Sequence, residues 1–479
     1  MVFFSCQSTF VIITSATSYP FYNLHYEKFA DGTVKCIEDE IPFDLPEGWE
    51  WARIYSIVDD LPYGTTKKSE NQGKVAVLRM GNIQVGEIDY NDLVYTNDDE
   101  DIRKYWLVAG DLLFNRTNSA EWVGKTSIYR GNQPCIFAGY LIRVRTHIIP
   151  EYLNIVMNSQ HAYDYCMRVK TDGVNQSNIN AQKLGAFLVP VPPTSEQIRI
   201  SSYVSTALPL IRRIQEEKGE IKQLISRTKA KILDLAIRGQ LVPQNPDDEP
   251  ASVLLEQIRI EKDALIKAGK IKRDNRESII FRDEDNSYYE KICEKTRCID
   301  DVIPFELPEG WIWVRGFTCF SGMESKRPSG AEFDYIDIDS VDNRAHAITE
   351  PKRLPAKEAP SRASRAVQSG SVLFSLVRPY LQNIAFVPAE YSACIASTGF
   401  YICNSNGLLL PEYMYYMMLS PYVIDGLNQF MKGDNSPSIG KDDIENWLYP
   451  VPPMQEQKRI VSQIQNTMAQ LAAIGMALA

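Results

Sequence analysis

Apolar residues recur at the seven-residue spacing of a coiled coil along one stretch in the middle of the chain. Two positions of each heptad form this seam, and all of them are apolar except one lysine and one threonine. The seam consists of Ile200, Val204, Ala207, Ile211, Ile214, Lys218, Ile221, Ile225, Thr228, Ile232 and Leu235. Prolines precede the stretch and Gly239 follows it, so the pattern predicts one long helix over 194–240. Pro209 lies inside it and predicts a kink or a fresh helix start.

The same apolar spacing returns at the carboxyl end of the chain. The residues that match the first seam are Ile460, Ile464, Thr467, Leu471, Ile474 and Leu478. They predict a second helix over 454–479, shortened relative to the first. Antiparallel pairing is the simplest way for one chain to bury both seams. We therefore expect long antiparallel coiled-coil helices that act as a spacer of fixed length.

Each helical stretch follows a copy of the same sequence pattern. IPFDLPEGWEW begins at Ile41, and IPFELPEGWIW begins at Ile303, which is 262 residues later (303 − 41). VPVPPTSEQIRI begins at Val189, and YPVPPMQEQKRI begins at Tyr449, which is 260 residues later (449 − 189). Because the two offsets nearly agree, the chain contains a duplicated domain and not a short repeat.

Each copy mixes short β-rich runs with one helical stretch, which begins at Pro150 in copy one and at Pro411 in copy two. The pattern predicts two α/β (α+β) domains with mainly antiparallel or mixed sheets, joined by the helices. The tryptophans that open the copies, at 49, 51, 311 and 313, are expected to be core anchors. The expected order is an amino-terminal segment at 1–40, a first domain at 41–193, the first long helix at 194–240, a linker with an amphipathic helix at 241–300, a second domain at 301–453 and the second helix at 454–479.

Composition narrows the class of protein. The 479 residues carry a net charge of −10, which argues against a general nucleic-acid binder but permits locally basic clefts. The nine cysteines are scattered without zinc-ligand spacing, so we expect reduced thiols and a cytoplasmic protein. No apolar run reaches the length of a membrane span, and no Lys or Arg precedes Lys28 to mark a signal peptide.

Motifs for catalysis are absent from the sequence. VGKTS at 123–127 lacks the first glycine of a phosphate loop and is followed by a strand-like run where a helix is required. The chain has no GxGxxG nucleotide loop, no acidic nuclease triad and no HExxH arrangement among its four histidines. We expect a protein that recognises a ligand and does not catalyse a reaction.

Polar residues suited to DNA lie at matching places in the two copies. Arginine can bind guanine and asparagine can bind adenine through paired hydrogen bonds, and cations bind phosphates. The candidates in copy one are Lys67, Lys68, Arg79, Asn82, Asn115, Arg116, Asn118, Lys125, Asn175, Gln176 and Asn178. The candidates in copy two are Lys326, Arg327, Arg344, Arg378, Tyr380, Asn383, Lys432, Asn435 and Lys441. Between Glu350 and Tyr380, six cations face two carboxylates, an excess of four positive charges.

These segments, taken in order, resemble the specificity (S) subunits of type I restriction–modification enzymes over nearly the whole chain. The resemblance rests on the two LPEGW openings, GDLLFNRTNSAEWVGK, NQSNIN, PVPPTSEQIRI and RGQLVPQNPDDEPASVLLEQIRIEKDALIKAGKIK. It implies two target recognition domains, each reading one half of a bipartite sequence in double-stranded DNA. It also implies helices that set the spacing and dock two methyltransferase subunits, with restriction subunits joining the complex. S-adenosylmethionine, ATP and magnesium would belong to those partners, and this chain would hold no cofactor.

Two alternatives of different classes remain open. A self-contained DNA methyltransferase or nuclease would need a cofactor-binding or metal motif, and a cofactor-binding assay on the chain would reveal it. A coiled-coil protein-interaction scaffold would show no sequence-dependent DNA affinity at any salt concentration.

Overall fold

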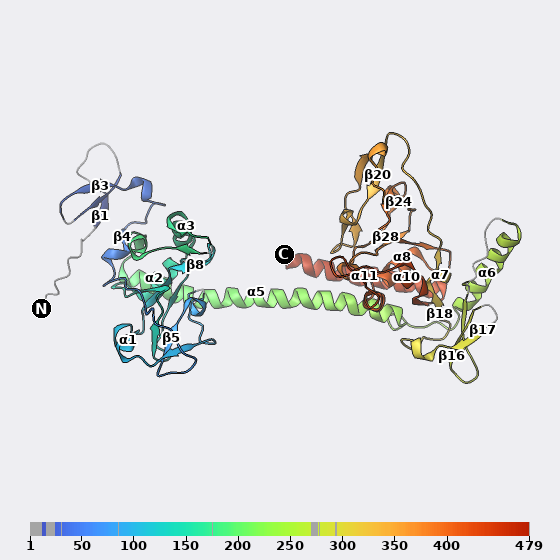
Figure 1. The fold of residues 1–479 in the computed structure, drawn as a ribbon, viewed down its shortest axis with the longest axis horizontal. Helices are drawn as coiled ribbons and strands as arrows, with labels where there is room; N and C mark the ends of the chain where they lie inside the picture. The colour runs from blue at the N-terminus through green and yellow to red at the C-terminus, as the bar shows by residue number, and fades with distance from the viewer. Residues whose placement is uncertain are drawn as a thin grey trace. The chain divides into compact units, whose positions relative to one another are not determined.

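The computed structural model describes residues 12–15, 24–29, 31–84, 86–174, 176–269, 276, 278–292 and 295–478 (Figure 1). The chain divides into two compact units, Met1–Gln215 and Glu216–Ala479. Each unit is described by itself.

Unit one contains small sheets and short helices around its own core. Its three-stranded sheets have the orders β1 (Ile12–Ser15)–β2 (His25–Lys28)–β3 (Val34–Cys36), β10 (Cys135–Phe137)–β5 (Val75–Leu78)–β6 (Val94–Thr96), β11 (Leu141–Val144)–β7 (Leu112–Asn115)–β9 (Thr126–Ile128) and β12 (Thr171–Asp172)–β13 (Ser177–Asn178)–β8 (Thr117–Asn118). A further pair joins β14 (Leu188–Val191) to β4 (Glu50–Arg53). Its helices are α1 (Asp99–Lys104), α2 (Pro150–Met157), α3 (Gln160–Val169), α4 (Ala181–Gly185) and the first part of α5 (Thr194–Ile237).

Unit two repeats this plan with larger sheets. The strand orders are β15 (Ser278–Arg282)–β16 (Tyr288–Ile292)–β17 (Lys295–Cys298), β18 (Ile312–Arg315)–β29 (Leu448–Val451), β19 (Phe320–Ser321)–β28 (Phe400–Ser405)–β25 (Val372–Ser375)–β26 (Ile384–Phe386)–β22 (Ala347–Ile348)–β21 (Val341–Asp342), and β23 (Lys352–Pro355)–β20 (Glu332–Ile336)–β27 (Ile395–Ser397)–β24 (Ala363–Ala366). The helices after α5 are α6 (Ala251–Lys267), α7 (Gly316–Cys319), α8 (Pro411–Met418), α9 (Pro421–Asn428), α10 (Lys441–Asn446) and α11 (Met454–Ala477). Antiparallel pairs dominate, while β5–β10, β20–β27 and β22–β26 are parallel, so the expected mixed sheets are confirmed.

The strand that opens each copy pairs with the strand that closes it. Trp51 of β4 lies opposite Pro190 of β14, and Trp313 of β18 lies opposite Pro450 of β29. Trp51 and Trp313 are buried, with exposed fractions of 3% and 1%. The expectation of core anchors is therefore confirmed for Trp51, Trp311 and Trp313, whereas Trp49 is only half-buried, and the repeated segments close each copy on itself.

The small sheet before each copy belongs to the repeat, although sequence reasoning did not include it. Arg53 on β4 donates hydrogen bonds to Glu27 on β2, the shorter at 2.8 Å. Arg315 on β18 donates to Glu290 on β16 at 2.9 and 3.0 Å. The two carboxylates are 263 residues apart (290 − 27), so this ion pair is duplicated with the rest.

A glutamine at the start of each long helix fastens the helix to its own domain. The side-chain oxygen of Gln197 accepts a hydrogen bond from the backbone of Ile149, and its amide donates to Pro192. Gln457 makes the same pair of contacts, accepting from Leu410 and donating to Pro452. Both glutamines are buried. Their hydrogen bonds satisfy amide and backbone groups whose burial without a partner would cost free energy.

Helix α5 has the predicted extent but not the predicted break. It runs unbroken through Pro209 for 44 residues, so the expected fresh start at that proline is wrong. A proline removes one backbone donor, and the remaining hydrogen bonds of so long a helix carry it through. Gly239 follows with a φ of +65°, the left-handed conformation that favours glycine after a helix.

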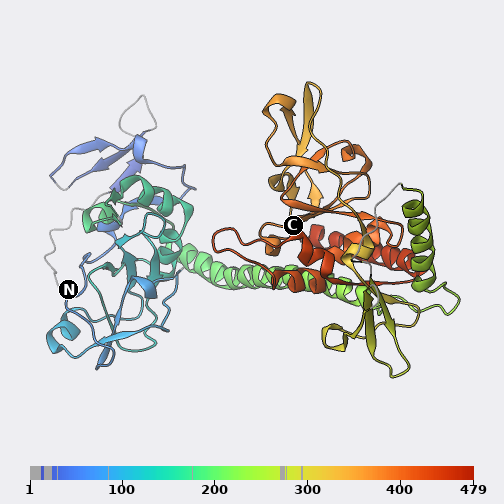
Figure 2. The same cartoon turned by 45° about the vertical axis from the view of Figure 1, so that its right-hand side comes forward.

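The expected antiparallel pairing of the long helices lies within unit two. In both views α11 runs beside the carboxyl-terminal part of α5 in the opposite direction (Figures 1 and 2). Ile232 of α5 and Ile460 and Ile464 of α11 are buried in one core cluster. Earlier on the α5 seam, Ile211 and Ile214 keep exposed fractions of 49% and 63%. The described residues thus cover the carboxyl-terminal end of the seam and leave Ile211, Ile214 and, at 37%, Ile221 exposed.

The helical stretch predicted in each copy is two short helices. In copy one Ser159 caps α3 and separates it from α2, and in copy two Ser420 does the same between α8 and α9. A serine side chain that accepts from the first turn favours a new helix start, and Pro421 strengthens it. In the acidic segment 97–101, the side chain of Asp98 caps α1.

Candidate nucleic-acid interface

The two polar segments predicted in copy one meet in a small sheet, which we call the first polar platform (116–118 and 176–178). Strand β13 pairs with β8, so that Ser177 lies opposite Asn118 and Asn178 lies opposite Thr117. The amide of Asn178 donates to Thr117 at 2.8 Å and accepts from Arg116 at 3.3 Å. Segments 60 residues apart in the chain therefore present one row of amide, hydroxyl and guanidinium groups.

Copy two builds a second polar platform at the same place (377–380 and 432–438). Val377 bridges to Ser438, and Lys432 bridges to Ser438 from the other side. The guanidinium of Arg378 donates to the backbone oxygen of Asn435 at 2.9 Å. Arg378 has a φ of 47° and Gln382 a φ of 56°, so two non-glycine residues hold left-handed conformations around this turn. Such strain is concentrated at binding sites, where the surrounding fold imposes it.

Aromatic rings pack against Arg116 of the first platform and against Lys125, which lies outside it. The guanidinium of Arg116 lies 4.5 Å from the centre of the Tyr63 ring, and the ammonium of Lys125 lies 3.9 Å from that of Trp122. Burial lowers the pKa of Lys125. Neither cation has a carboxylate partner in the described part of the chain. Tyr63 and Trp122 were not among the sequence candidates, and their exposed fractions of 40% and 48% are the signal that only a structure supplies.

Known proteins share this chain's organisation. No family model matches the chain. The EcoAI type I restriction enzyme specificity subunit of Escherichia coli is 23% identical over 492 residues, which cover 89% of this chain and 78% of that subunit. The EcoEI type I restriction enzyme specificity subunit of Escherichia coli is 24% identical over 398 residues, covering 71% of this chain and 64% of that subunit.

The chain is similar over most of its length to specificity subunits of type I restriction enzymes. The resemblance seen in the sequence is thereby confirmed. The fold agrees, because a chain in a solved structure of a type I restriction–modification system superposes with a TM-score of 0.53 at 18% identity, covering 91% of this chain and 94% of that one.

Several candidate residues of copy one lie away from the first platform. Lys67 forms ion pairs with Asp98 at 2.7 Å and Asp101 at 3.2 Å, and these two partners raise the pKa of its ammonium. Arg79 forms an ion pair with Asp92 at 2.9 Å. Local carboxylates therefore neutralise both cations.

Two asparagine candidates of copy one lie in the interior of unit one. Asn82 is 3% exposed, and its amide contacts the backbone of Arg79, Asp89 and Asp92, so it holds a turn together. Asn115 is fully buried, and neither atom of its amide has a hydrogen-bond partner among the described residues. Burial corrects the expectation that these two side chains are presented at the surface.

The remaining candidates of copy one lie at the surface or outside the described residues. Asn118 is half-buried and accepts from the backbone of Ser119 at 2.8 Å. Gln176 and Lys68 are exposed. Asn175 lies outside the described residues.

In copy two the other candidates spread over three places. Tyr380 is exposed beside Arg378 on the second platform, and the backbone of half-buried Asn383 accepts from Ser375 of β25. Lys441 opens α10 and lies 4.0 Å from Glu445. Exposed residues Lys326, Arg327 and Arg344 lie outside the platform segments.

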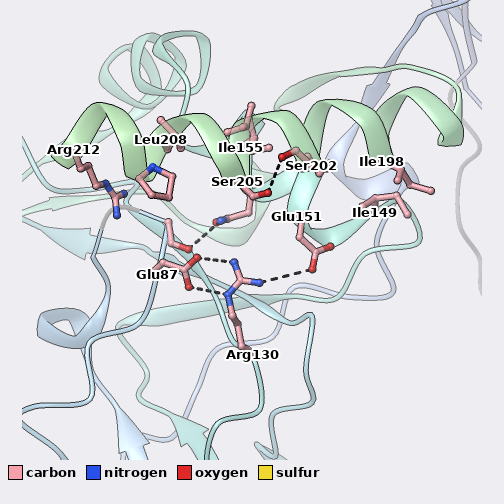
Figure 3. A pocket seen from close by; sticks show the side chains of 15 residues that line it. Glu87, Arg130, Ile149, Glu151, Ile155, Ile198, Ser202, Ser205, Leu208 and Arg212 are labelled. Atoms are coloured by element: carbon pink, nitrogen blue, oxygen red, sulfur yellow. Dashed lines mark hydrogen bonds and ion pairs between the residues drawn. The ribbon is translucent and has the colours of Figure 1, made fainter. Parts of the chain in front are cut away.

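Each unit of the chain also carries a groove beside its long helix. In unit one a groove of about 650 Å³ lies between α2 and the first turns of α5, with Arg130 at its rim between Glu87 and Glu151 (Figure 3). In unit two a groove of about 490 Å³ lies between α8 and α11 and includes Glu412, which follows Glu151 by 261 residues (412 − 151). The first groove is lined by as many carboxylates as guanidiniums and the second by Glu390 and Glu412, so neither has the excess of cations that DNA phosphates need, and neither includes a platform residue.

The described residues show neither a metal-binding cluster nor a helix suited to span a membrane. The described residues contain no cluster of three or more His, Cys, Asp or Glu side chains placed to hold a metal ion. No helix within the described ranges combines the length and apolar character that crossing a membrane requires.

Proposed function

We propose that this chain is the DNA-recognition subunit of a type I restriction–modification complex. Each copy reads one half of a bipartite target in double-stranded DNA through its polar platform. The observation that carries the proposal is the same platform built twice, from segments at the same repeat offset, within a family of specificity subunits.

The chemistry of the platforms supports base reading. Arg116 and Asn178 present a guanidinium and an amide side by side, and Arg378 with Tyr380 offers a guanidinium beside an aromatic ring. Guanidinium and amide groups are those that recognise guanine and adenine edges through paired hydrogen bonds. Because the two platforms differ in sequence, they read different half-sites.

The helices set the distance between half-sites and dock two methyltransferase subunits, which restriction subunits then join. The exposed seam residues of α5 and the two grooves beside α5 and α11 are the surfaces that support this assignment. Apolar helix surface that faces solvent is characteristic of a protein–protein contact. S-adenosylmethionine, ATP and magnesium act in those partners, and this chain recognises DNA without catalysing a reaction.

The test is to co-express the chain with its methyltransferase subunit and map the methylated sites. A bipartite sequence with a fixed gap is the expected result, and methylation without sequence preference contradicts the proposal. Exchanging residues 54–188 for the same region of another specificity subunit should change one half-site and leave the other. If both half-sites change, the copies do not read independently.

A further inference from the structure

One sheet of unit two has cations along both of its edges, and the edges differ in how those cations are neutralised. The strand order is β23–β20–β27–β24. On the β23 edge, the ammonium of Lys352 lies 2.6 Å from Asp339, and the guanidinium of Arg353 lies 2.8 Å from Glu332. Both cations of this edge are therefore satisfied within the protein.

The opposite edge continues beyond β24 into residues 324–327. Ser325 bridges to Arg365 of β24, and the backbone of Lys326 donates to Ser364 at 3.0 Å. The backbone of Ala366 returns a bond to Glu324 at 3.0 Å. Four cations thus lie on two adjacent segments, which we call the β24 edge: Lys326, Arg327, Arg362 and Arg365.

The cations of the β24 edge have no carboxylate partner in the part of the chain that the structure describes. Lys326 donates to the backbone oxygen of Ala393 at 3.3 Å, and Nε of Arg365 is buried without an acceptor. Glu324 is the one carboxylate on segments 324–327 and 362–366, which leaves a net charge of +3 (4 − 1) in a chain whose total is −10. Guanidinium donors held together without anions are poised for an anion from outside.

Copy one carries the opposite arrangement at the corresponding dibasic pair. Lys67 precedes Lys326 by 259 residues (326 − 67), close to the repeat offset. There the acidic start of α1 neutralises Lys67, which contacts Asp98, and also Lys74, which lies 2.9 Å from Asp99. The two copies therefore differ in electrostatics at this place although they share the fold.

We propose that the β24 edge is a binding site for the phosphate backbone of duplex DNA, present in the second copy and absent from the first. The inference rests on the proposed DNA-recognition function. Phosphate contacts give affinity without sequence information, so this edge positions the second copy on DNA while its platform reads bases. The first copy, whose cations are neutralised here, depends more on its own platform.

The test compares two charge-matched double variants of the full chain, R362Q/R365Q on the β24 edge and K352Q/R353Q on the β23 edge. Both remove two positive charges from the same sheet. Binding to a mixed-sequence duplex of about 40 base pairs is measured over a range of salt concentrations, because each lost phosphate contact reduces the salt slope by roughly 0.9. Thermal unfolding of each variant reports whether it is folded.

The expected result is a salt slope smaller by about two for R362Q/R365Q and unchanged for K352Q/R353Q. Preference for the specific site over mixed sequence should stay the same in both, since phosphate contacts carry no sequence information. Equal slopes for R362Q/R365Q and the unaltered chain overturn the inference and leave the proposed function standing. If the unaltered chain binds no DNA at any salt concentration, the proposed function falls, and the inference falls with it. If R362Q/R365Q unfolds early, the single variant R362Q, whose side chain is exposed, decides by a slope reduced by about one.

Discussion

The indole nitrogen of Trp311 donates a hydrogen bond of 2.9 Å to Glu456, at the start of α11. The residues are 145 positions apart, one in the opening segment of copy two and one in the closing segment. Copy one repeats the contact between Trp49 and Glu196 at 3.2 Å. In each copy, one bond ties the domain to its long helix.

Glu456→Ala should destabilise unit two by about 1.5–3 kcal/mol, because it leaves the buried Trp311 nitrogen without its charged acceptor. Glu196→Ala is the matched control and should cost less than about 1 kcal/mol, since Glu196 is only half-buried. Denaturant unfolding followed by tryptophan fluorescence measures both. Equal losses would contradict the importance of burial at this joint.

Arg116→Ala should weaken binding to the cognate site by about 1–3 kcal/mol and relax preference in one half-site. Arg378→Ala should do the same for the other half. Arg130→Ala is the control, because its guanidinium is engaged by Glu87 at 2.6 Å and lies at the groove of unit one. Competition binding with duplexes altered in one half-site separates the outcomes, and a uniform loss over both halves would argue against independent reading.

Asn82→Ala should lower the free energy of unfolding by about 1–3 kcal/mol without altering which bases are read. The reason is that the Asn82 amide joins Arg79 to the backbone of Asp89 and Asp92 inside the turn. Gln84→Ala removes one exposed hydrogen bond to Gly81 and should be within about 0.5 kcal/mol of the unaltered chain. A changed methylation pattern in a folded Asn82→Ala variant would show that this residue does read DNA.

The Glu290 ion pair should make unit two sensitive to acid. Burial would raise the pKa of Glu290, but hydrogen bonds from Arg315 and Arg297 outweigh it and hold the pKa below the ordinary value of 4.5. A lowered folded pKa means that the stabilisation is fully present above 4.5 and is lost as the pH falls through the lower, folded value. Glu290→Gln should therefore cost about 1–3 kcal/mol at pH 7 and progressively less below pH 4.5. Urea midpoints compared over this range test it, and a constant gap at every pH would refute the linkage.

The double substitution Ile211→Gln/Ile214→Gln should change the free energy of unfolding by no more than about 0.5 kcal/mol relative to the unaltered chain, because both side chains are largely exposed. The double variant should recover less methyltransferase subunit in co-purification. Ile232→Gln, at a buried position of the same seam, should instead cost about 2–5 kcal/mol. Undiminished recovery with the double variant would move the docking surface elsewhere.

Local signals in the sequence were enough to predict the two helices α5 and α6. The spacing of apolar residues and the residues at each end predicted α5 over 194–240, against 194–237 observed, and an amphipathic helix within 241–300, where α6 lies. Both signals act within one or two helical turns, which is the range that a sequence displays directly. The break at Ser159 was missed because the apolar pattern continues across it.

The sequence could not show which cations of the candidate interface are neutralised by carboxylates within the protein. The excess of four positive charges over 350–380 includes Lys352 and Arg353, which pair with Asp339 and Glu332, 13 and 21 residues earlier. Lys67 is likewise neutralised by Asp98, 31 residues later. Such pairs depend on strands that meet only in the fold, so a local count of charges misjudges which cations face outward. The repeat offset could have revealed one pair, since Glu27 with Arg53 recurs as Glu290 with Arg315.

The pairing of β4 with β14, and of β18 with β29, gives each copy neighbouring entrance and exit points. A gene segment exchanged by recombination between those points therefore has to preserve only the register of one two-stranded pairing. The long helix that follows then keeps its heptad register. New DNA sequence preferences can then be acquired by exchanging the interior of one copy, while a partner that binds the long helix meets an unaltered surface.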